Sequence, residues 1–269
     1  MNNQAIGVFD SGIGGLTVAK AINDLLPNEK IIYFGDTAHL PYGEKSQSAI
    51  QEYSKVISEF LLNKNCKCIV IACNTASAFA RNVVAELAVG KIVQNVIDPI
   101  AVEAVKLNNG GLVGVIATKG TTESRNYPNA INDLNSDIPV SSLATPLLVP
   151  MIEEGFFNDN ISHTIINNYL TDPILENIEQ LILGCTHFPL IEKEIQEVFL
   201  EHGKEVDIIN SAKVVARSLE SELSKRSLLS NKLNGNHEFY VSDYTRSFEL
   251  STQQFFGKQV LLEEAKVWR

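Results

Sequence analysis

The chain has 269 residues, of which 45% are hydrophobic and 20% charged, and these ordinary globular values exclude a disordered, fibrous or disulfide-scaffold protein. Lysine and arginine number 22 against 32 aspartates and glutamates, which gives a net charge of −10. Because the only notable basic cluster is Lys225-Arg226, nucleic acid and membrane surfaces are excluded as main partners.

Short apolar runs alternate with longer amphipathic stretches along the chain. The apolar runs predict strands at residues 5–9, 30–35, 67–72, 91–96, 111–117 and 180–184. Apolar residues at helical spacing predict helices at 46–62 and 75–87, after a first helix that should stop near Pro27. Strands that alternate with helices predict an α/β fold with mostly parallel sheets, covered by helices on both faces.

The chain is expected to cross between two halves at two points. Asp98-Pro99 is the first, because proline biases the residue before it away from helix. Asn210-Ser211 is the second. We therefore expect a first domain of residues 1–97 plus 210–269 and a second domain of residues 98–209.

The sequence also predicts the compartment. The start, Met1-Asn2-Asn3-Gln4, has no basic region, and no stretch approaches the ~18 apolar residues that a membrane helix needs. We therefore expect a cytoplasmic protein whose four cysteines are free thiols.

Cys73 and Cys185 stand in matching contexts. Residues 69–75 and 181–187 each contain an apolar strand, a small residue, a cysteine and then polar residues. Both cysteines should end a strand and begin a helix, at the sheet edge where open α/β folds bind ligands. Because the positive end of a helix stabilises a thiolate, each thiol is expected to have a lowered pKa and to serve as a base or nucleophile near neutral pH. The alternative is a buried cysteine that packs as a small hydrophobe.

The loop from Asp10 to Gly15, after the first strand, is a candidate anion site. Its glycines let backbone N–H groups approach a ligand, and the following helix favours a negative charge. It matches neither a dinucleotide fingerprint nor a Walker loop, but a carboxylate-bearing ligand fits. The alternative is a tight turn with a capping Asp10. Residues 36–43 should form another loop on the same rim.

A metal site is not predicted. Cys66 and Cys68, with Cys73 nearby, match no common zinc spacing, and both are expected at or within the third strand. His187 lies two residues after Cys185, where a thiol needs a proton partner. The other histidines are expected to be surface residues or to have ordinary partners: His39, His163, His202 and His237.

Four longer motifs occur along the chain: Asp-Ser-Gly-x-Gly-Gly-Leu-Thr-Val at 10–18, Tyr-Phe-Gly-Asp…Pro-Tyr-Gly at 33–43, Ala-Cys-Asn-Thr-Ala-Ser at 72–77 and Gly-Cys-Thr-His-Phe-Pro-Leu at 184–190. In this order they resemble the bacterial glutamate racemases of the aspartate/glutamate racemase superfamily, over most of the chain up to about residue 255. The resemblance implies two similar three-layer α/β domains with the active site in the cleft between them. It also implies interconversion of L- and D-glutamate without a cofactor.

The resemblance implies roles for individual residues as well. Racemisation removes the Cα proton from one face and returns a proton to the other, and Cys73 and Cys185 are the implied bases. Asp10 would assist Cys73, His187 would assist Cys185, and Glu153, or the adjacent Glu154, would supply a carboxylate near the second cysteine. The implied substrate-binding residues are Asp10, Ser11, Tyr42, Gly43, Asn74, Thr75, Thr118, Thr121, Thr186 and His187.

The implied purpose is D-glutamate for peptidoglycan and cell-wall biogenesis, in a homodimer in a bacterial cytoplasm. Three other functions stay open. The same chemistry on L-aspartate would leave both cysteine motifs unchanged. A binding or regulatory protein would have no need of two activated thiols. A thiol oxidoreductase is disfavoured because the sequence has no Cys-x-x-Cys.

Overall fold

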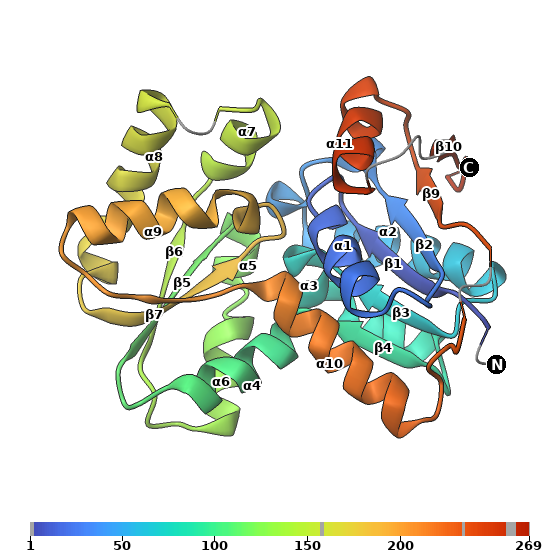
Figure 1. Cartoon of the computed structure of the whole chain (residues 1–269), viewed down its shortest axis with the longest axis horizontal. Coiled ribbons are helices and arrows are strands. Elements are labelled where there is room, and N and C mark those ends of the chain that lie inside the picture. Colours follow the sequence, from blue (N-terminus) through green and yellow to red (C-terminus); the bar gives the residue numbers. More distant parts are fainter. Residues whose placement is uncertain (1–2, 157–158, 233–234, 257–261, 269) are drawn as a thin grey trace.

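The computed structural model describes residues 3–156, 159–232, 235–256 and 262–268. Met1 and Asn2, which belong to the start of the chain used above to predict the compartment, lie outside the described residues. The described strands form two parallel sheets, one in each of two lobes that lie side by side (Figure 1). The expected α/β class with mostly parallel sheets is therefore confirmed.

The larger sheet has six strands in the order β10-β9-β2-β1-β3-β4. Its strands are β1 (Ile6–Asp10), β2 (Ile31–Gly35), β3 (Cys68–Ile71), β4 (Ile92–Asn95), β9 (Glu238–Val241) and β10 (Leu262–Glu264). The smaller sheet has four strands in the order β6-β5-β7-β8. Its strands are β5 (Leu112–Ala117), β6 (Val140–Ala144), β7 (Ile178–Gly184) and β8 (Asp207–Ile209).

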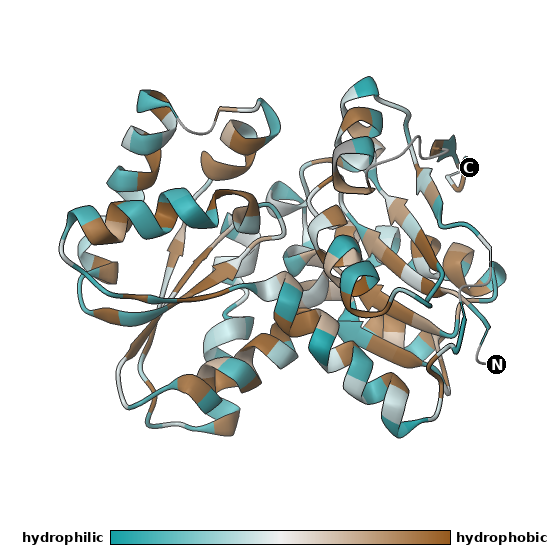
Figure 2. Ribbon diagram, in the orientation of Figure 1, coloured by the Kyte–Doolittle hydropathy of each residue, from teal (hydrophilic) through white to brown (hydrophobic). Residues whose placement is uncertain are grey.

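Helices cover both faces of both sheets. The longer helices are α1 (Leu16–Leu25), α2 (Gln47–Asn63), α3 (Asn74–Leu87), α4 (Ile97–Leu107), α6 (Asn126–Leu134), α8 (Asn160–Leu170), α9 (Glu192–Glu201), α10 (Ser211–Lys225) and α11 (Arg246–Phe256). The short ones are α5 (Lys119–Glu123), α7 (Leu148–Glu153), η1 (Thr37–His39), η2 (Tyr42–Glu44), η3 (Pro173–Leu175) and η4 (Phe188–Ile191). Brown apolar residues fill the strands and the inward helix faces in Figure 2, the pattern expected of buried parallel sheets.

The hydrophobic core has three parts. One cluster runs continuously through both lobes, because α1, α4, α6 and α10 pack on one face of the two sheets. A second cluster lies between the larger sheet and α2 and α3, and a third lies between the smaller sheet and α7, α8 and α9. The shared cluster joins the two lobes through α4 and α10, which are also the helices where the chain passes from one sheet to the other.

The register of the strands places their carboxyl ends in line. In the larger sheet Asp10 pairs with Gly35, and the backbone N–H of Ala72 donates to the Phe9 carbonyl at 2.8 Å. In the smaller sheet Ala117 pairs with both Ala144 and Gly184. The residues that follow these strand ends, including both motif cysteines, therefore emerge at one edge of each sheet.

All six predicted strands are confirmed, within one or two residues at each end. The helix expected to begin at Cys185 is wrong: residues 185–187 form a turn, and the 3₁₀ helix η4, with Pro189 near its start, precedes α9. Asp98-Pro99 does not interrupt a helix but lies in the first turn of α4. Proline is tolerated there because the backbone N–H groups of a first turn make no hydrogen bond within the helix. The domain boundaries 1–97 plus 210–269 and 98–209 stay a prediction.

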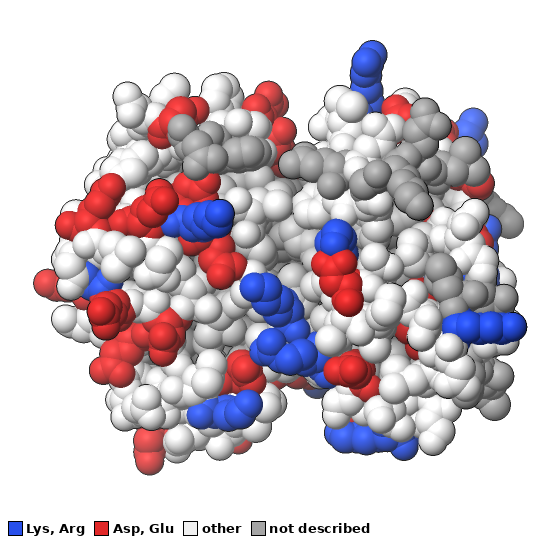
Figure 3. All heavy atoms as spheres, in the orientation of Figure 1, with Lys and Arg blue, Asp and Glu red and all other residues white. Residues whose placement is uncertain are grey.

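Charges of both signs occupy the same face. Acidic side chains are spread over the lobe of α8 and α9, and basic ones gather where α10 crosses between the lobes (Figure 3). None of the helices in the described residues is long and apolar enough to cross a membrane.

Candidate active site

Asp10, Ser11 and Cys73 form the half of the site that the larger sheet carries. Cys73 follows β3 and is the N-cap of α3: its sulfur accepts the Ala76 N–H at 3.4 Å. The Cys73 sulfur also lies 3.8 Å from the Ser11 hydroxyl, to which the thiol donates. Asp10 ends β1, is fully buried, and accepts the Gly12 N–H at 2.9 Å.

The pKa of Cys73 is raised to about 12, which contradicts the lowering expected from the start of a helix. Burial is the main cause, and the negative charge of Asp10 adds to it. The Ala76 N–H and the Ser11 hydroxyl lower the pKa of Cys73, but by less. A charge on Cys185 raises the pKa of Cys73 further.

Cys185, His187 and Glu153 form the half of the site that the smaller sheet carries. Cys185 follows β7 and is 6% exposed. Its sulfur lies 3.7 Å from His187 Nδ1, and His187 Nε2 lies 3.0 Å from Glu153 Oε1. With its Nε2–H donated to Glu153, the imidazole presents Nδ1 to the thiol, where it can accept the S–H proton or donate to the thiolate.

The pKa of His187 is raised to about 10. Burial alone would lower it, but the hydrogen bonds to Cys185 and Glu153 and their negative charges outweigh burial. Both adjacent glutamates are exposed, but Glu153 is the one that contacts His187, whereas Glu154 follows the last residue of α7.

The two halves touch at the start of α1. A Cβ on Gly14 would lie 2.3 Å from the Thr186 hydroxyl and 2.5 Å from the His187 ring, so only glycine fits there. The Thr186 hydroxyl donates to Asp10 at 3.4 Å, and the Thr17 hydroxyl donates to the Thr186 carbonyl at 2.9 Å. The Asp10–Gly15 loop and the second cysteine turn thus lie in direct contact. The pKa of Asp10 is raised by burial, although the charge of His187 and the Gly12 N–H act against that shift.

Three threonine hydroxyls from the two lobes meet near the start of α3. Thr75 Oγ1 lies 3.1 Å from Thr118 Oγ1 and 3.3 Å from Thr121 Oγ1. Thr75 belongs to α3, whereas Thr118 and Thr121 follow β5 in the other lobe. A Cβ on Gly43 would lie 2.9 Å from the Thr118 side chain, so the residue 36–43 loop also reaches the opposite lobe.

Asn74 has a buried polar atom without a protein partner. Its Oδ1 accepts the Tyr127 hydroxyl at 2.6 Å, but its Nδ2 group, which is buried, has no hydrogen-bond partner in the part of the chain that the structure describes. Buried polar groups are almost always satisfied, and an unsatisfied donor next to a buried thiol indicates a place for an acceptor on a ligand. A carboxylate oxygen is such an acceptor.

Tyr42 is placed differently from a side chain that contacts substrate. Its hydroxyl donates to Asp36 at 2.6 Å, and Asp36 also accepts from Ser242 at 2.7 Å. The Tyr42 hydroxyl thereby ties the residue 36–43 loop together, and Gly43 next to it lines a cavity. The sequence interpretation assigned no individual role to Asp36 or Thr17, although both stand inside the motifs at 10–18 and 33–43.

A cavity of about 200 Å³ opens beside these residues. One wall comes from the 36–43 loop and η2, and the other from α5, α7 and the segment after β6; its lining includes Gly43, Thr118 and Glu153. Its lining thus shares Thr118 with the threonine cluster and Glu153 with the Cys185 half of the site. Among the described residues, no three His, Cys, Asp or Glu side chains converge as they do around a metal ion.

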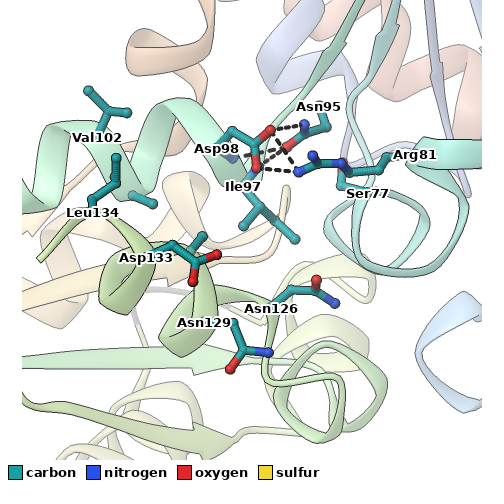
Figure 4. Close-up of a pocket in the computed structure, with 12 residues that line it drawn as sticks. Ser77, Arg81, Asn95, Ile97, Asp98, Val102, Asn126, Asn129, Asp133 and Leu134 are labelled. Atoms are coloured by element: carbon teal, nitrogen blue, oxygen red, sulfur yellow. Dashed lines mark hydrogen bonds and ion pairs between the residues drawn. The ribbon is translucent and has the colours of Figure 1, made fainter. Parts of the chain in front are cut away.

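A second cavity, of about 280 Å³, lies between α3, α4 and α6 (Figure 4). Arg81 forms an ion pair with Asp98 at 2.6 Å on one wall, and Asn126, Asn129 and Asp133 line the opposite wall. None of the predicted catalytic residues lines this cavity.

Comparisons with known proteins agree with one another. The model of the Asp/Glu/Hydantoin racemase family matches residues 6–219. The chain is 41% identical over 255 residues to a glutamate racemase of Geobacter metallireducens, covering 94% of this chain and 93% of that protein. The crystal structure of a Francisella tularensis glutamate racemase in complex with D-glutamate superimposes with a TM-score of 0.91 at 38% identity, covering 99% of both chains. A Bacillus anthracis glutamate racemase isoform gives a TM-score of 0.92 at 36% identity, covering 99% of this chain and 98% of the other. Because the family model spans most of the chain and the relatives match nearly all of it, the chain belongs to the Asp/Glu/Hydantoin racemase family.

Proposed function

We propose that this protein is a glutamate racemase, which interconverts L- and D-glutamate without a cofactor. The observation that carries the proposal is the pair of buried cysteines at the strand ends of two facing sheets, each with its own polar partners. The relatives named glutamate racemase, at 41% identity over most of the chain, support glutamate as the substrate.

The proposed chemistry uses two bases. One cysteine, as the thiolate, removes the Cα proton, and the other, as the thiol, protonates the opposite face of the resulting carbanion. A negative charge on Cys185 raises the pKa of Cys73, which supports a state with one thiolate and one thiol. Binding an amino acid brings an ammonium group beside the thiols, and that positive charge would offset the rise in pKa caused by burial.

Neighbouring groups support proton transfer at each thiol. His187, held by Glu153, faces the Cys185 sulfur and can take or return its proton. Asp10 has no direct hydrogen bond to Cys73 among the described contacts; its charge acts on Cys73, and Ser11 makes the contact. We propose that Asp10 and His187 assist Cys73 and Cys185 respectively.

The carbanion needs fixed dipoles around the α-carboxylate, since no electron sink is proposed. The unpartnered Asn74 amide is a donor suited to a carboxylate. The remaining donors we propose for substrate are backbone N–H groups of the Tyr42–Gly43 loop and the hydroxyls of Ser11, Thr75, Thr118, Thr121 and Thr186.

The experiment that tests the function is proton NMR of the purified, reduced protein with L-glutamate in D₂O and no added cofactor. Loss of the Cα–H signal, together with D-glutamate on a chiral assay, is the expected result. L-Aspartate is run in parallel, because the same two cysteines would serve an aspartate enzyme. Exchange with aspartate alone would replace the proposed substrate, and exchange with neither would overturn the function.

Replacing Glu153 by glutamine is expected to move the alkaline limb of kcat/KM to lower pH by roughly one unit. Glu153 helps to raise the pKa of His187 to about 10, so removing its charge lowers that pKa and the imidazolium is lost at lower pH. The measurement is kcat/KM for racemisation between pH 6 and 10.5. Glu154→Gln is the matched control, because Glu154 is also exposed but makes no contact with His187 among the described hydrogen bonds, and its profile should be that of the unmodified protein. An unshifted limb in Glu153→Gln would show that His187 ionisation does not govern turnover.

We propose further that the product D-glutamate supplies peptidoglycan synthesis in a bacterial cytoplasm, and that the protein is a homodimer. The family supports both statements. Growth of a D-glutamate auxotroph carrying this chain tests the first, and sedimentation at micromolar concentration tests the second.

A further inference from the structure

Thr17 stands on α1, in the lobe of the larger sheet, and reaches across to the other lobe. Its side chain is buried, at 7% exposure, and its hydroxyl lies 2.9 Å from the carbonyl of Thr186. Thr186 is the residue between Cys185 and His187. Among the described contacts, this is the hydrogen bond by which the first lobe holds the backbone of the second cysteine turn.

The single proton of the hydroxyl is shared between two carbonyls, because the oxygen also lies 2.8 Å from the Gly14 carbonyl. The Gly14 carbonyl keeps the Thr17 backbone N–H at 3.0 Å whichever way the hydroxyl points. The Thr186 carbonyl has no such partner among the described backbone hydrogen bonds. Losing the Thr17 hydroxyl would therefore leave a buried carbonyl unpaired, at the peptide that joins the thiol to its imidazole.

Gly14 makes this contact sensitive to position. Gly14, in the turn just before α1, lies so close to the second cysteine turn that a Cβ on it would meet both Thr186 and His187. Residues 185–187 therefore have no free space into which they could move toward α1. Away from α1, the Thr17 hydrogen bond restrains the same residues.

We infer that Thr17 is a positioning residue: it fixes the distance between the Cys185–His187 turn and the Cys73 half of the site. The inference rests on the proposed racemase function. Racemisation requires the two sulfurs on opposite sides of one Cα, so the spacing of the halves is part of the catalytic geometry. A displacement on the order of 1 Å away from the reacting atoms can cost about 10²-fold in rate.

The test compares Thr17→Val, which keeps the shape and loses the hydroxyl, with Thr17→Ser, which keeps the hydroxyl. We expect Thr17→Val to lower kcat by about 10- to 100-fold with KM changed less than about threefold, and Thr17→Ser to stay within about threefold of the unmodified protein. Thr252→Val is the matched control, because the Thr252 hydroxyl is also buried but its one partner among the described hydrogen bonds is the Phe248 carbonyl within α11. Thr17→Ala replaces Thr17→Val in the comparison if the valine variant does not fold.

A second readout does not depend on turnover. The rates at which iodoacetamide alkylates Cys73 and Cys185 are measured separately by peptide mass spectrometry. We expect Thr17→Val to change the rate at Cys185 at least about threefold and to leave the rate at Cys73 unchanged. Equal changes at both cysteines, or a serine variant as impaired as the valine variant, would indicate general destabilisation and overturn the inference. If the unmodified protein racemises nothing, the proposed function fails, and the alkylation rates still decide whether Thr17 positions the turn.

Discussion

Replacing either Cys73 or Cys185 by alanine is expected to lower kcat/KM for glutamate racemisation by at least about 10³-fold. The loss should be equal in both directions for each variant. The two enantiomers have the same free energy in water, so the equilibrium constant fixes the ratio of their kcat/KM values whatever the mutation. A chiral assay started from pure L- or pure D-glutamate measures both values.

Solvent deuterium distinguishes the two-base mechanism from other causes of inactivity. Each alanine variant keeps one thiol, which can still remove a proton from one face of Cα and return a deuteron to the same face. Cys73→Ala should therefore exchange the Cα–H of one enantiomer without inverting it, and Cys185→Ala should exchange that of the other. Inversion within about tenfold of the unmodified rate in either variant would contradict the mechanism.

Cys66→Ala is the matched control for both substitutions. Cys66 is also fully buried and has its pKa raised to about 12, chiefly by burial, but it precedes β3 at the opposite end of the strand from Cys73. Removing its sulfur should leave kcat/KM within about threefold of the unmodified value. A loss as large as that of Cys73→Ala would mean that alanine at any of these cysteines damages the fold.

The strands that could be predicted from the sequence are mainly those in the middle of a sheet. β1, β2, β3, β5 and β7 are buried on both faces and read as continuous apolar runs. β6, β8 and β10 lie at sheet edges, where a strand has a neighbouring strand on one side only. β6 is half-buried and has the sequence Val-Ser-Ser-Leu-Ala. Such strands carry no apolar run, and pairing with an existing sheet specifies them instead.

The candidate site likewise has residues that the local sequence pattern predicts and contacts that it does not. Residue types at strand ends identified Cys73, Cys185 and His187, because those positions follow from local pattern. The contact between Thr17 and Thr186 joins residues 169 positions apart, and no local pattern reveals it. The direction of the Cys73 pKa shift was wrong for the same reason: the helix start is local, whereas burial and the Asp10 charge come from the folded lobes.

Lys67 forms an ion pair with Glu29 deep in the larger lobe. The Lys67 Nζ lies 2.5 Å from Glu29 Oε2, and both side chains are only 1% exposed. Lys67 also donates to the Leu228 carbonyl at 2.7 Å, and Glu29 accepts the Ser230 backbone N–H at 2.8 Å. The pair therefore ties the segment after α10 to the start of β3.

Lys67→Met is expected to lower the free energy of unfolding by about 3–5 kcal/mol, because it leaves the Glu29 carboxylate buried without its counter-charge. Urea unfolding followed by circular dichroism measures the loss. Lys225→Met is the matched control: Lys225 pairs with Glu222 at the surface with 67% of its side chain exposed, and its loss should stay within about 0.5 kcal/mol.

The double variant Glu29→Leu with Lys67→Met separates an unpaired charge from lost packing. Removing both charges replaces the ion pair with apolar groups of similar volume, which is often close to neutral in stability. The double variant should therefore recover part of the loss seen in Lys67→Met, with the lost hydrogen bonds from the Ser230 N–H to Glu29 and from Lys67 to the Leu228 carbonyl limiting the recovery. If it is as unstable as Lys67→Met plus Glu29→Leu added together, the two side chains do not act as a pair. The racemase assay on the same variants should show kcat unchanged in the folded fraction, since neither residue lines the cavity beside the thiols.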